Sequence, residues 1–311
     1  MGNRPDLAVE LCGNHLPTPL VLASGILGTE AELLARVAEA GAGAVTAKSC
    51  SLQPRAGHPN PTVLAWEHGL INAVGLANPG VEAEVVELAR AKALLGPRGA
   101  ALIASVFADT VENYARVAAR IVEARPDLIE VNISCPNVHD EFGALFAADA
   151  GAAAEVTAAV REAVAGRAPV LVKLSPHVAD IAAIARAVEA AGADGISAIN
   201  TLPGMVIDVH ARRPILANRS GGLSGPAIRP LAVRCVYEIY QAVEIPIVGM
   251  GGVSSGRDAV EMIMAGATAV GVGSAAYGQG PQVFGRILDE MALLMIELGY
   301  ERVEQMRGMA H

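Results

Sequence analysis

Short apolar runs alternate with amphipathic stretches along most of the chain. The apolar runs have the length of single strands, and they are 20–24, 43–48, 101–107, 128–134, 169–175, 195–201, 246–252 and 269–275. Helical spacing follows most of them. In 30–42 this spacing places Leu33, Leu34, Val37 and Ala38 on one face of the helix. In 178–193 it does the same for Ile181, Ile184, Ala185 and Val188.

This alternation predicts a parallel sheet covered by helices, because strands that are apolar throughout are buried on both faces. Eight such units are the number that closes a (β/α)8 TIM barrel. A doubly wound sheet is the alternative, and it is disfavoured because no G-x-G-x-x-G follows the first strand. Three predicted helices end in Ala-Gly-Ala, at 40–42, 191–193 and 265–267, where glycine suits a left-handed C-cap.

Three further segments extend this barrel. Residues 7–14 and 16–24 predict a small N-terminal β-hairpin across the barrel floor. Long βα-loop insertions, 49–79 and 202–225, follow the second and sixth strands, and loops of that length are usually functional. No change in composition marks a linker, so we expect residues 1–311 to form a single domain.

Composition and charge narrow the class of protein. The chain is 52% hydrophobic but only 3% aromatic, so its core must consist of Ala, Val, Ile and Leu. A net charge of −9 argues against nucleic-acid and anionic-membrane partners, which require a basic surface. There is no apolar run of transmembrane length, and charges occupy the first residues where a signal peptide would be apolar. We therefore expect a soluble, cytoplasmic protein.

The four cysteines are widely separated, at Cys12, Cys50, Cys135 and Cys235, and no C-x-x-C pair exists. A zinc site or an iron–sulfur cluster held by this chain alone is therefore not expected.

In a (β/α)8 barrel the active site lies at the C-terminal ends of the strands. The glycine-rich segments 249–259 and 271–281 follow the last two strands, where backbone N–H groups of Gly251, Gly252, Gly273 and Ser274 could bind phosphate. Ordinary turn chemistry is the alternative for both. Lys48 and Lys173 end apolar strands, which favours contact with an anion or cofactor over simple extension of the side chain into solvent.

Four asparagines lie at or near the same strand ends: Asn72, Asn132, Asn137 and Asn200. An amide both donates and accepts, so this group suits a flat ring with C=O and N–H edges, although loop-capping asparagines are also common.

Cys135 precedes a proline where the fourth strand becomes a loop, which suits a nucleophile or general base as well as a buried structural thiol. Cys50 is a lesser rival, and Cys12 and Cys235 have the pattern of structural residues.

Six motifs, in order along most of the chain, resemble dihydroorotate dehydrogenase: INAVGLANPG (71–80), VNISCPNV (131–138), VKLSP (172–176), INTLPGM (199–205), RPILANRSGGLSGPAIRP (213–230) and GMGGV (249–253). Finer features, notably NTLPGM, RPILAN and GGLSGPA, are similar to the class 1B, NAD-linked catalytic subunit. The resemblance implies FMN in the barrel and oxidation of dihydroorotate to orotate in pyrimidine biosynthesis. It also implies that Cys135 removes the C5 proton while hydride passes from C6 to flavin N5.

The same resemblance assigns the binding residues. The substrate would contact Lys48, Asn72, Ala73, Val74, Gly75, Leu76, Asn132, Asn137, Asn200 and Thr201. FMN would contact Ser24, Lys48, Ser49, Ser105, Asn132, Lys173, Ile199, Gly225, Gly251, Gly252, Gly273 and Ser274. Two features depart from the family pattern: Ser105 stands where class 1B usually has asparagine, and the loop after Cys135 is shorter than the usual lid.

Partners also follow from the resemblance. It implies a homodimer that joins an electron-transfer subunit carrying FAD and a [2Fe–2S] cluster, as a heterotetramer that passes electrons to NAD. Fumarate is an alternative acceptor. Two other functions stay open: a flavin enzyme acting on another dihydropyrimidine, and a phosphate-binding barrel without redox chemistry.

Overall fold

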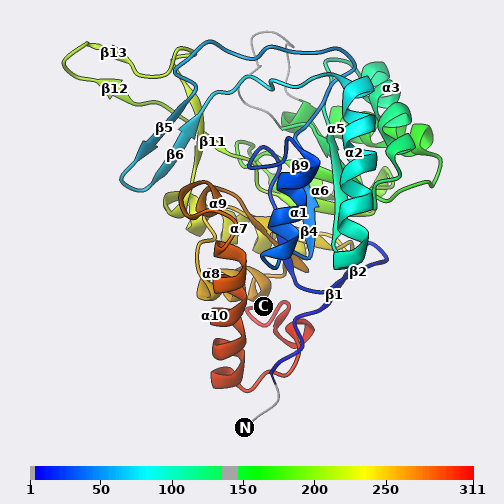
Figure 1. Cartoon of the computed structure of the whole chain (residues 1–311), viewed down its shortest axis with the longest axis vertical. Coiled ribbons are helices and arrows are strands. Elements are labelled where there is room, and N and C mark those ends of the chain that lie inside the picture. Colours follow the sequence, from blue (N-terminus) through cyan, green and yellow to red (C-terminus); the bar gives the residue numbers. More distant parts are fainter. Residues whose placement is uncertain (1–3, 135–145) are drawn as a thin grey trace.

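A closed barrel of eight parallel strands forms the centre of the computed structural model, which describes residues 4–134 and 146–311 (Figure 1). Its strands are β3 (Leu20–Leu22), β4 (Ala44–Thr46), β7 (Ala101–Val106), β8 (Leu128–Asn132), β9 (Val170–Leu174), β10 (Gly195–Ala198), β15 (Ile247–Met250) and β16 (Ala269–Val272). Neighbours along the chain are neighbours in the barrel, and β16 closes it against β3. The predicted (β/α)8 barrel and its eight strands are confirmed.

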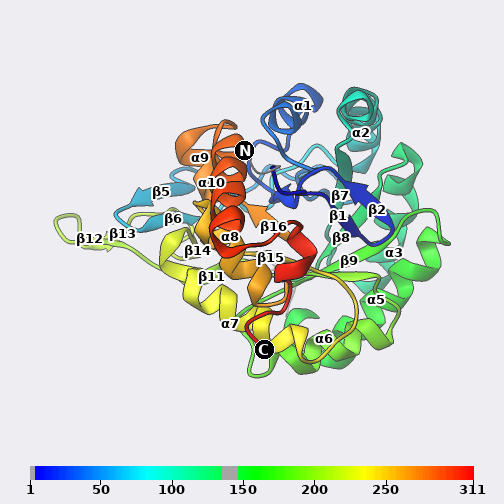
Figure 2. The ribbon, with the colours of Figure 1, turned by 90° about the horizontal axis from the view of Figure 1, so that it is seen from below.

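Helices surround the barrel, as the view along it shows (Figure 2). They are α1 (Ala31–Glu39), α2 (Val81–Leu95), α3 (Val111–Ile121), α5 (Ala150–Val164), α6 (Ile181–Ala190), α7 (Arg229–Tyr240), α8 (Gly256–Met264), α9 (Ser274–Gln279) and α10 (Val283–Leu298). The predicted face of α6 is buried in full. On α1, Leu34 and Val37 are buried, whereas Leu33 and Ala38 are half-buried. The glycines of the three Ala-Gly-Ala segments have the predicted positive φ, 114°, 94° and 119° at Gly41, Gly192 and Gly266.

The N-terminal hairpin is also present, as β1 (Val9–Leu11) and β2 (Asn14–Leu16). Cys12 donates its S–H to the carbonyl of Asp194 at 3.3 Å, and the Asn14 amide donates to the carbonyl of Asp127 at 3.4 Å. Both acceptors lie just before the start of a barrel strand, so the hairpin covers the N-terminal end of the barrel. Its second strand ends at Leu16, earlier than predicted, because the following apolar run belongs to β3.

The two long insertions form a structure that their sequence does not predict. They pair with each other in one antiparallel sheet of order β11-β14-β6-β5, and its strands are β5 (Val63–Trp66), β6 (Gly69–Asn72), β11 (Leu202–Gly204) and β14 (Gly221–Ser224). The short strands β12 (Ile207–Asp208) and β13 (Arg213–Pro214) form a hairpin that projects from the body (Figure 1). Ile71, Ala73 and Leu216 are the buried centre of a second, small hydrophobic cluster. Pairing of Gly222 with Asn72 joins the insertions.

The main core lies between barrel and helices and consists mostly of Ala, Val, Ile and Leu, as composition predicts. None of the helices in the described ranges combines the length and the apolarity that crossing a membrane requires.

Glu84, in the first turns of α2, is an exception to this apolar packing, since only 3% of its surface is exposed. Burial raises the pKa of Glu84 from its ordinary 4.5 to about 7. The negative charge of Glu87 adds to this increase, and the positive charge of Lys48 opposes it. The folded state therefore holds this proton over a range of pH in which the unfolded chain has lost it. As a result, the free energy of unfolding falls as the pH rises from about 4.5 to 7.

We predict that Glu84→Gln removes this fall in the free energy of unfolding with rising pH. The stability difference between variant and wild type should be near zero below pH 4.5 and reach about 3 kcal/mol in favour of the variant above pH 7. Denaturant unfolding at several pH values measures it. Glu155→Gln, at an exposed position on α5, is the matched control and should show no such trend. A pH-independent difference for Glu84→Gln would contradict the prediction.

Candidate active site

One cavity opens at the C-terminal ends of the barrel strands, between the barrel and the sheet of the insertions. Most of the predicted binding residues line it: Ser24, Lys48, Ser49, Asn72, Val74, Gly75, Leu76, Asn132, Lys173, Ile199, Asn200, Thr201, Gly225, Gly251, Gly252, Gly273 and Ser274. They come from segments far apart in sequence, which barrel closure and the pairing of the two insertions bring together.

Two of the predicted residues in the described part of the chain do not line the cavity. Ala73 is fully buried in the small cluster of the insertions, and its N–H donates to the carbonyl of Thr62 at 2.7 Å. Ser105 is 1% exposed and lies behind Ser49. Cys135 and Asn137 lie outside the described residues.

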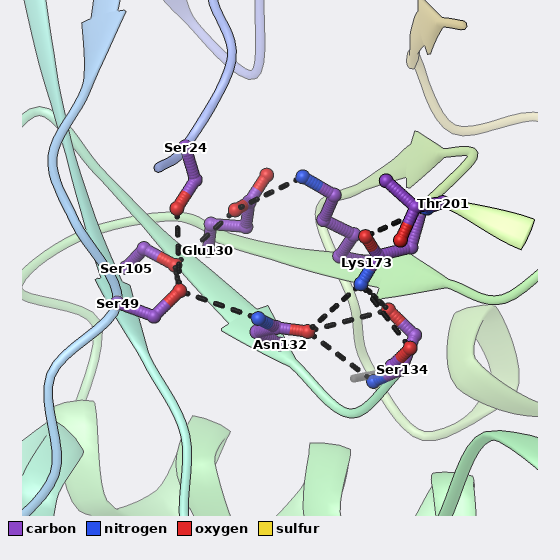
Figure 3. Close-up of polar contacts among 9 residues, drawn as sticks. Ser24, Ser49, Ser105, Glu130, Asn132, Ser134, Lys173 and Thr201 are labelled. Carbon is purple, nitrogen blue, oxygen red and sulfur yellow. Dashed lines mark hydrogen bonds and ion pairs between the residues drawn. The ribbon is translucent and has the colours of Figure 1, made fainter. Parts of the chain in front are cut away.

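The amides at one side of the cavity are held by Ser134. The Asn200 side-chain amide donates to the hydroxyl of Ser134 at 2.9 Å and to its carbonyl at 3.1 Å. The Asn132 side-chain oxygen accepts from the Ser134 N–H at 3.3 Å, while its NH₂ donates to the Ser49 hydroxyl at 3.2 Å (Figure 3). The Thr201 N–H donates to the Asn200 side chain at 2.8 Å. These bonds fix the orientation of both amides before any ligand arrives.

A second set of contacts runs beneath the cavity. The hydroxyls of Ser24 and Ser49 lie 3.2 Å apart, and those of Ser49 and Ser105 lie 2.8 Å apart. Ser105 donates to a carboxylate oxygen of Glu130 at 3.2 Å, and the Lys173 ammonium lies 3.8 Å from the same oxygen (Figure 3). The side chain of Lys173 is only 6% exposed, and that of Glu130 only 2%. Lys173 thus presents a buried positive charge at the cavity wall.

The segment that follows β6 is held in an unusual backbone conformation. Gly75 and Leu76 have φ of 75° and 57°. The Arg55 guanidinium donates to the Gly75 carbonyl at 2.8 Å, and the His58 N–H donates to the Val74 carbonyl at 3.1 Å. A Cβ at Gly75 would lie 2.5 Å from the His58 ring, so a side chain has no room there. This packing holds 74–76 against the cavity.

The glycine loops after β15 and β16 form another part of the cavity wall. Gly251 and Gly252 have φ of 136° and 76°, values that favour glycine. Within residues 4–134 and 146–311, no protein oxygen accepts a hydrogen bond from the backbone N–H of Gly252, Gly273 or Ser274. Gly252 is buried, and Gly273 and Ser274 are half-buried at the start of α9, where N–H groups have no partner within the helix. These donors are therefore suited to a ligand anion.

Cys50, the lesser rival of Cys135, is fully buried, and burial raises the pKa of its thiol well above its ordinary value, with the nearby carboxyl of Glu84 adding to the effect. Burial likewise raises the pKa of the Cys12 thiol, to about 12. Because the thiolate is the reactive form, neither residue suits catalysis.

Sequence reasoning missed Glu130 and Ser134. A signal exists for Glu130, which is a charged residue in the middle of the apolar run 128–134 and lies two positions before Asn132, on the same face of the strand. Ser134 has no comparable signal, since its role depends on Asn200, which follows the distant strand β10.

The family model of dihydroorotate dehydrogenase matches residues 6–295 of the chain. The chain is 46% identical to the protein named dihydroorotate dehydrogenase B (NAD(+)), catalytic subunit, of Methanosarcina mazei, over 99% of this chain and 96% of that one. Proteins of the same name from Methanothermobacter thermautotrophicus and Desulforudis audaxviator are each 45% identical, over 98% of this chain and 98% and 97% of theirs. With the barrel and its lined cavity, these matches show that the chain belongs to the dihydroorotate dehydrogenase family of oxidoreductases.

Proposed function

We propose that this chain is the FMN-binding catalytic subunit of an NAD-linked dihydroorotate dehydrogenase, which oxidises dihydroorotate to orotate in pyrimidine biosynthesis. The observation that carries the proposal is one cavity that combines buried Lys173, oriented amides and backbone N–H groups that donate to no oxygen of the described residues. The names of the relatives, which describe catalytic subunits of dihydroorotate dehydrogenase B (NAD(+)), support it.

The residues of the cavity fit FMN in two parts. The unbonded N–H groups of Gly252, Gly273 and Ser274 would hold the phosphate, because several backbone donors at one place suit an oxyanion. Lys173 would contact the polar edge of the ring system, since an ammonium has three donors and its ion-pair partner Glu130 lies beyond hydrogen-bond distance. Ser24, Lys48, Ser49, Ile199, Gly225 and Gly251 would complete the site, with Ser105 supporting Ser49 from behind.

The substrate would lie against the amides. Dihydroorotate has a carboxylate and a ring with alternating C=O and N–H groups, which Asn72, Asn132 and Asn200 can meet with both donors and acceptors. Thr201, Lys48 and 74–76 line the same part of the cavity. Ala73 would contribute backbone support, and Asn137 a further amide. Bound FMN supplies the acceptor for the C6 hydride of the substrate.

Cys135 would take the C5 proton of dihydroorotate. A proton next to a carbonyl requires a base within hydrogen-bond reach, and this thiol directly follows Ser134, which orients both Asn132 and Asn200. The exclusion of Cys50 and Cys12 by burial strengthens this assignment.

Electrons would leave through a partner. We propose a homodimer of this chain joined to an electron-transfer subunit with FAD and a [2Fe–2S] cluster, in a heterotetramer. The word "subunit" in the names of the relatives supports a second protein.

This function predicts a defined acceptor dependence. The FMN-loaded chain alone should form orotate from dihydroorotate with an artificial dye as acceptor, but reduce NAD⁺ only after the partner subunit is added. Orotate absorbance and NADH formation measure the two reactions. No orotate with any acceptor would refute the activity, while direct reduction of NAD⁺ by the chain alone would refute the role of the partner.

Cys135→Ser should lower kcat about 10²–10⁴-fold near neutral pH, because general-base catalysis contributes about that much. FMN content should not change. Cys12→Ser is the matched control, since a serine hydroxyl can also donate to the Asp194 carbonyl, and it should keep the wild-type rate. An unchanged rate in Cys135→Ser would remove Cys135 from the base role.

Ser274→Asp should weaken FMN binding at least about tenfold, since it places a negative charge beside the proposed phosphate donors. Riboflavin, which lacks the phosphate, should bind the variant and the wild type alike. Fluorescence titration of the apoprotein measures both affinities. Gln279→Glu adds the same charge at an exposed position of the same helix and should leave FMN affinity unchanged. Equal losses for FMN and riboflavin would place the phosphate elsewhere.

A further inference from the structure

Glu130 is a carboxylate inside the barrel wall that the proposed reaction does not use. It lies in the middle of β8, where it pairs with Ser105 of β7 and Leu171 of β9. Paired positions on neighbouring strands project to the same side of the sheet, so Glu130 and Ser105 do so. Residues two positions apart on one strand also share a side, so Glu130 projects as Asn132 does, one layer deeper in the barrel. The residue is 1% exposed. A carboxylate at such a place is costly unless it is both paired and hydrogen-bonded.

Both conditions are met by side chains from other strands. The Ser105 hydroxyl donates to one carboxylate oxygen at 3.2 Å, and Lys173 provides the opposite charge at 3.8 Å from the same oxygen. The Ser105 hydroxyl in turn contacts Ser49 at 2.8 Å. Through Ser49 the network reaches Ser24 on one side of the cavity, and through Glu130 it reaches Lys173 on the other (Figure 3). Its two ends line the cavity, while Ser105 and Glu130 lie behind the cavity wall.

This arrangement constrains Lys173. A lysine has four rotatable bonds and no intrinsic preference for one direction, so a fixed anion is needed to hold its ammonium at one point of the cavity. The anion itself is fixed, because the Ser105 hydrogen bond anchors Glu130 to the neighbouring strand. Ser197, which pairs with Lys173 on β10, has a buried hydroxyl without a hydrogen-bond partner in the described part of the chain, so it does not compete as an anchor.

The same anion reduces the charge that the cavity presents. Seen from the cavity, the Lys173 ammonium and the Glu130 carboxylate form a dipole whose positive end lies at the wall. A ligand that gains negative charge at this wall is stabilised by the ammonium and destabilised by the carboxylate behind it. The balance between the two charges therefore affects how readily the ligand gains that charge.

We propose that Glu130 is a positioning residue that fixes the Lys173 ammonium at the cavity wall and, as its counter-charge, sets the reduction potential of the bound cofactor. The inference rests on the proposed function, since it requires FMN in this cavity. Glu130 contacts neither the cavity nor a ligand there and acts through Lys173.

Three variants test the proposal through the midpoint potential of bound FMN, measured against a reference dye. Glu130→Gln keeps the size and the acceptor for Ser105 but removes the negative charge, so the potential should rise. Lys173→Gln removes the positive charge, so the potential should fall. Each change should alter the redox equilibrium constant at least tenfold, which is about 30 mV for a two-electron couple. The double variant removes both charges, and with them the dipole whose positive end faces the ligand, so its potential should lie between those of Lys173→Gln and the wild type.

The double variant separates charge compensation from a merely structural role. If Glu130 only supported β8, the double variant would differ from wild type at least as much as Lys173→Gln does. Glu238→Gln, which makes the same chemical change in an exposed ion pair with Arg234, is the matched control and should not shift the potential.

Each outcome is decisive. Opposite shifts in the two single variants, with the double variant between Lys173→Gln and the wild type, support the proposal. If Glu130→Gln fails to fold, a double-variant potential above that of Lys173→Gln supports it alone. The proposal is overturned if Glu130→Gln leaves the midpoint potential unchanged. It is also overturned if the potential of the double variant is no closer to wild type than that of Lys173→Gln. Either result leaves the proposed function intact. Wild-type protein that binds no FMN overturns both.

Discussion

Closure of the parallel barrel is the constraint on which the site depends. Eight strands that run in one direction and close on themselves place all their C-terminal ends in one ring. Residues at or just after the ends of β4, β8 and β9 therefore meet although as many as 124 positions separate them, as Ser49, Asn132 and Lys173 illustrate. The antiparallel pairing of the two insertions then adds Asn72 and 74–76 to the same ring.

The barrel interior consequently contains both apolar packing and buried polar groups. Its lower layers are aliphatic, but the layer below the cavity contains Ser105 and Glu130, and the next contains Asn132 and Lys173. Burial of such groups is tolerated because each has a partner from another strand. Loss of one partner leaves a buried polar group uncompensated, so the network links the stability of the barrel to the chemistry at its mouth.

Much of the fold and of the cavity wall could be predicted from the sequence, because both follow from local patterns. Apolar runs of strand length define the barrel, and the polar residues that end them, such as Lys48 and Asn200, necessarily lie at the ring. Pairings between distant segments have no such local signal. The sheet shared by the insertions and the bonds of Ser134 to Asn200 are of this kind. Ser105 does not line the cavity, and its position on β7 does not reveal that Ser49, from the loop after β4, lies between them.

The proposed function requires that this one cavity bring dihydroorotate within reach of an FMN held beside Lys173. Anaerobic titration of the FMN-loaded chain with dihydroorotate, followed by flavin absorbance, tests it most directly. The predicted result is loss of the flavin absorbance at one equivalent of dihydroorotate per chain, with one orotate formed. A flavin that stays oxidised in excess dihydroorotate, yet is bleached by a chemical reductant, would contradict it.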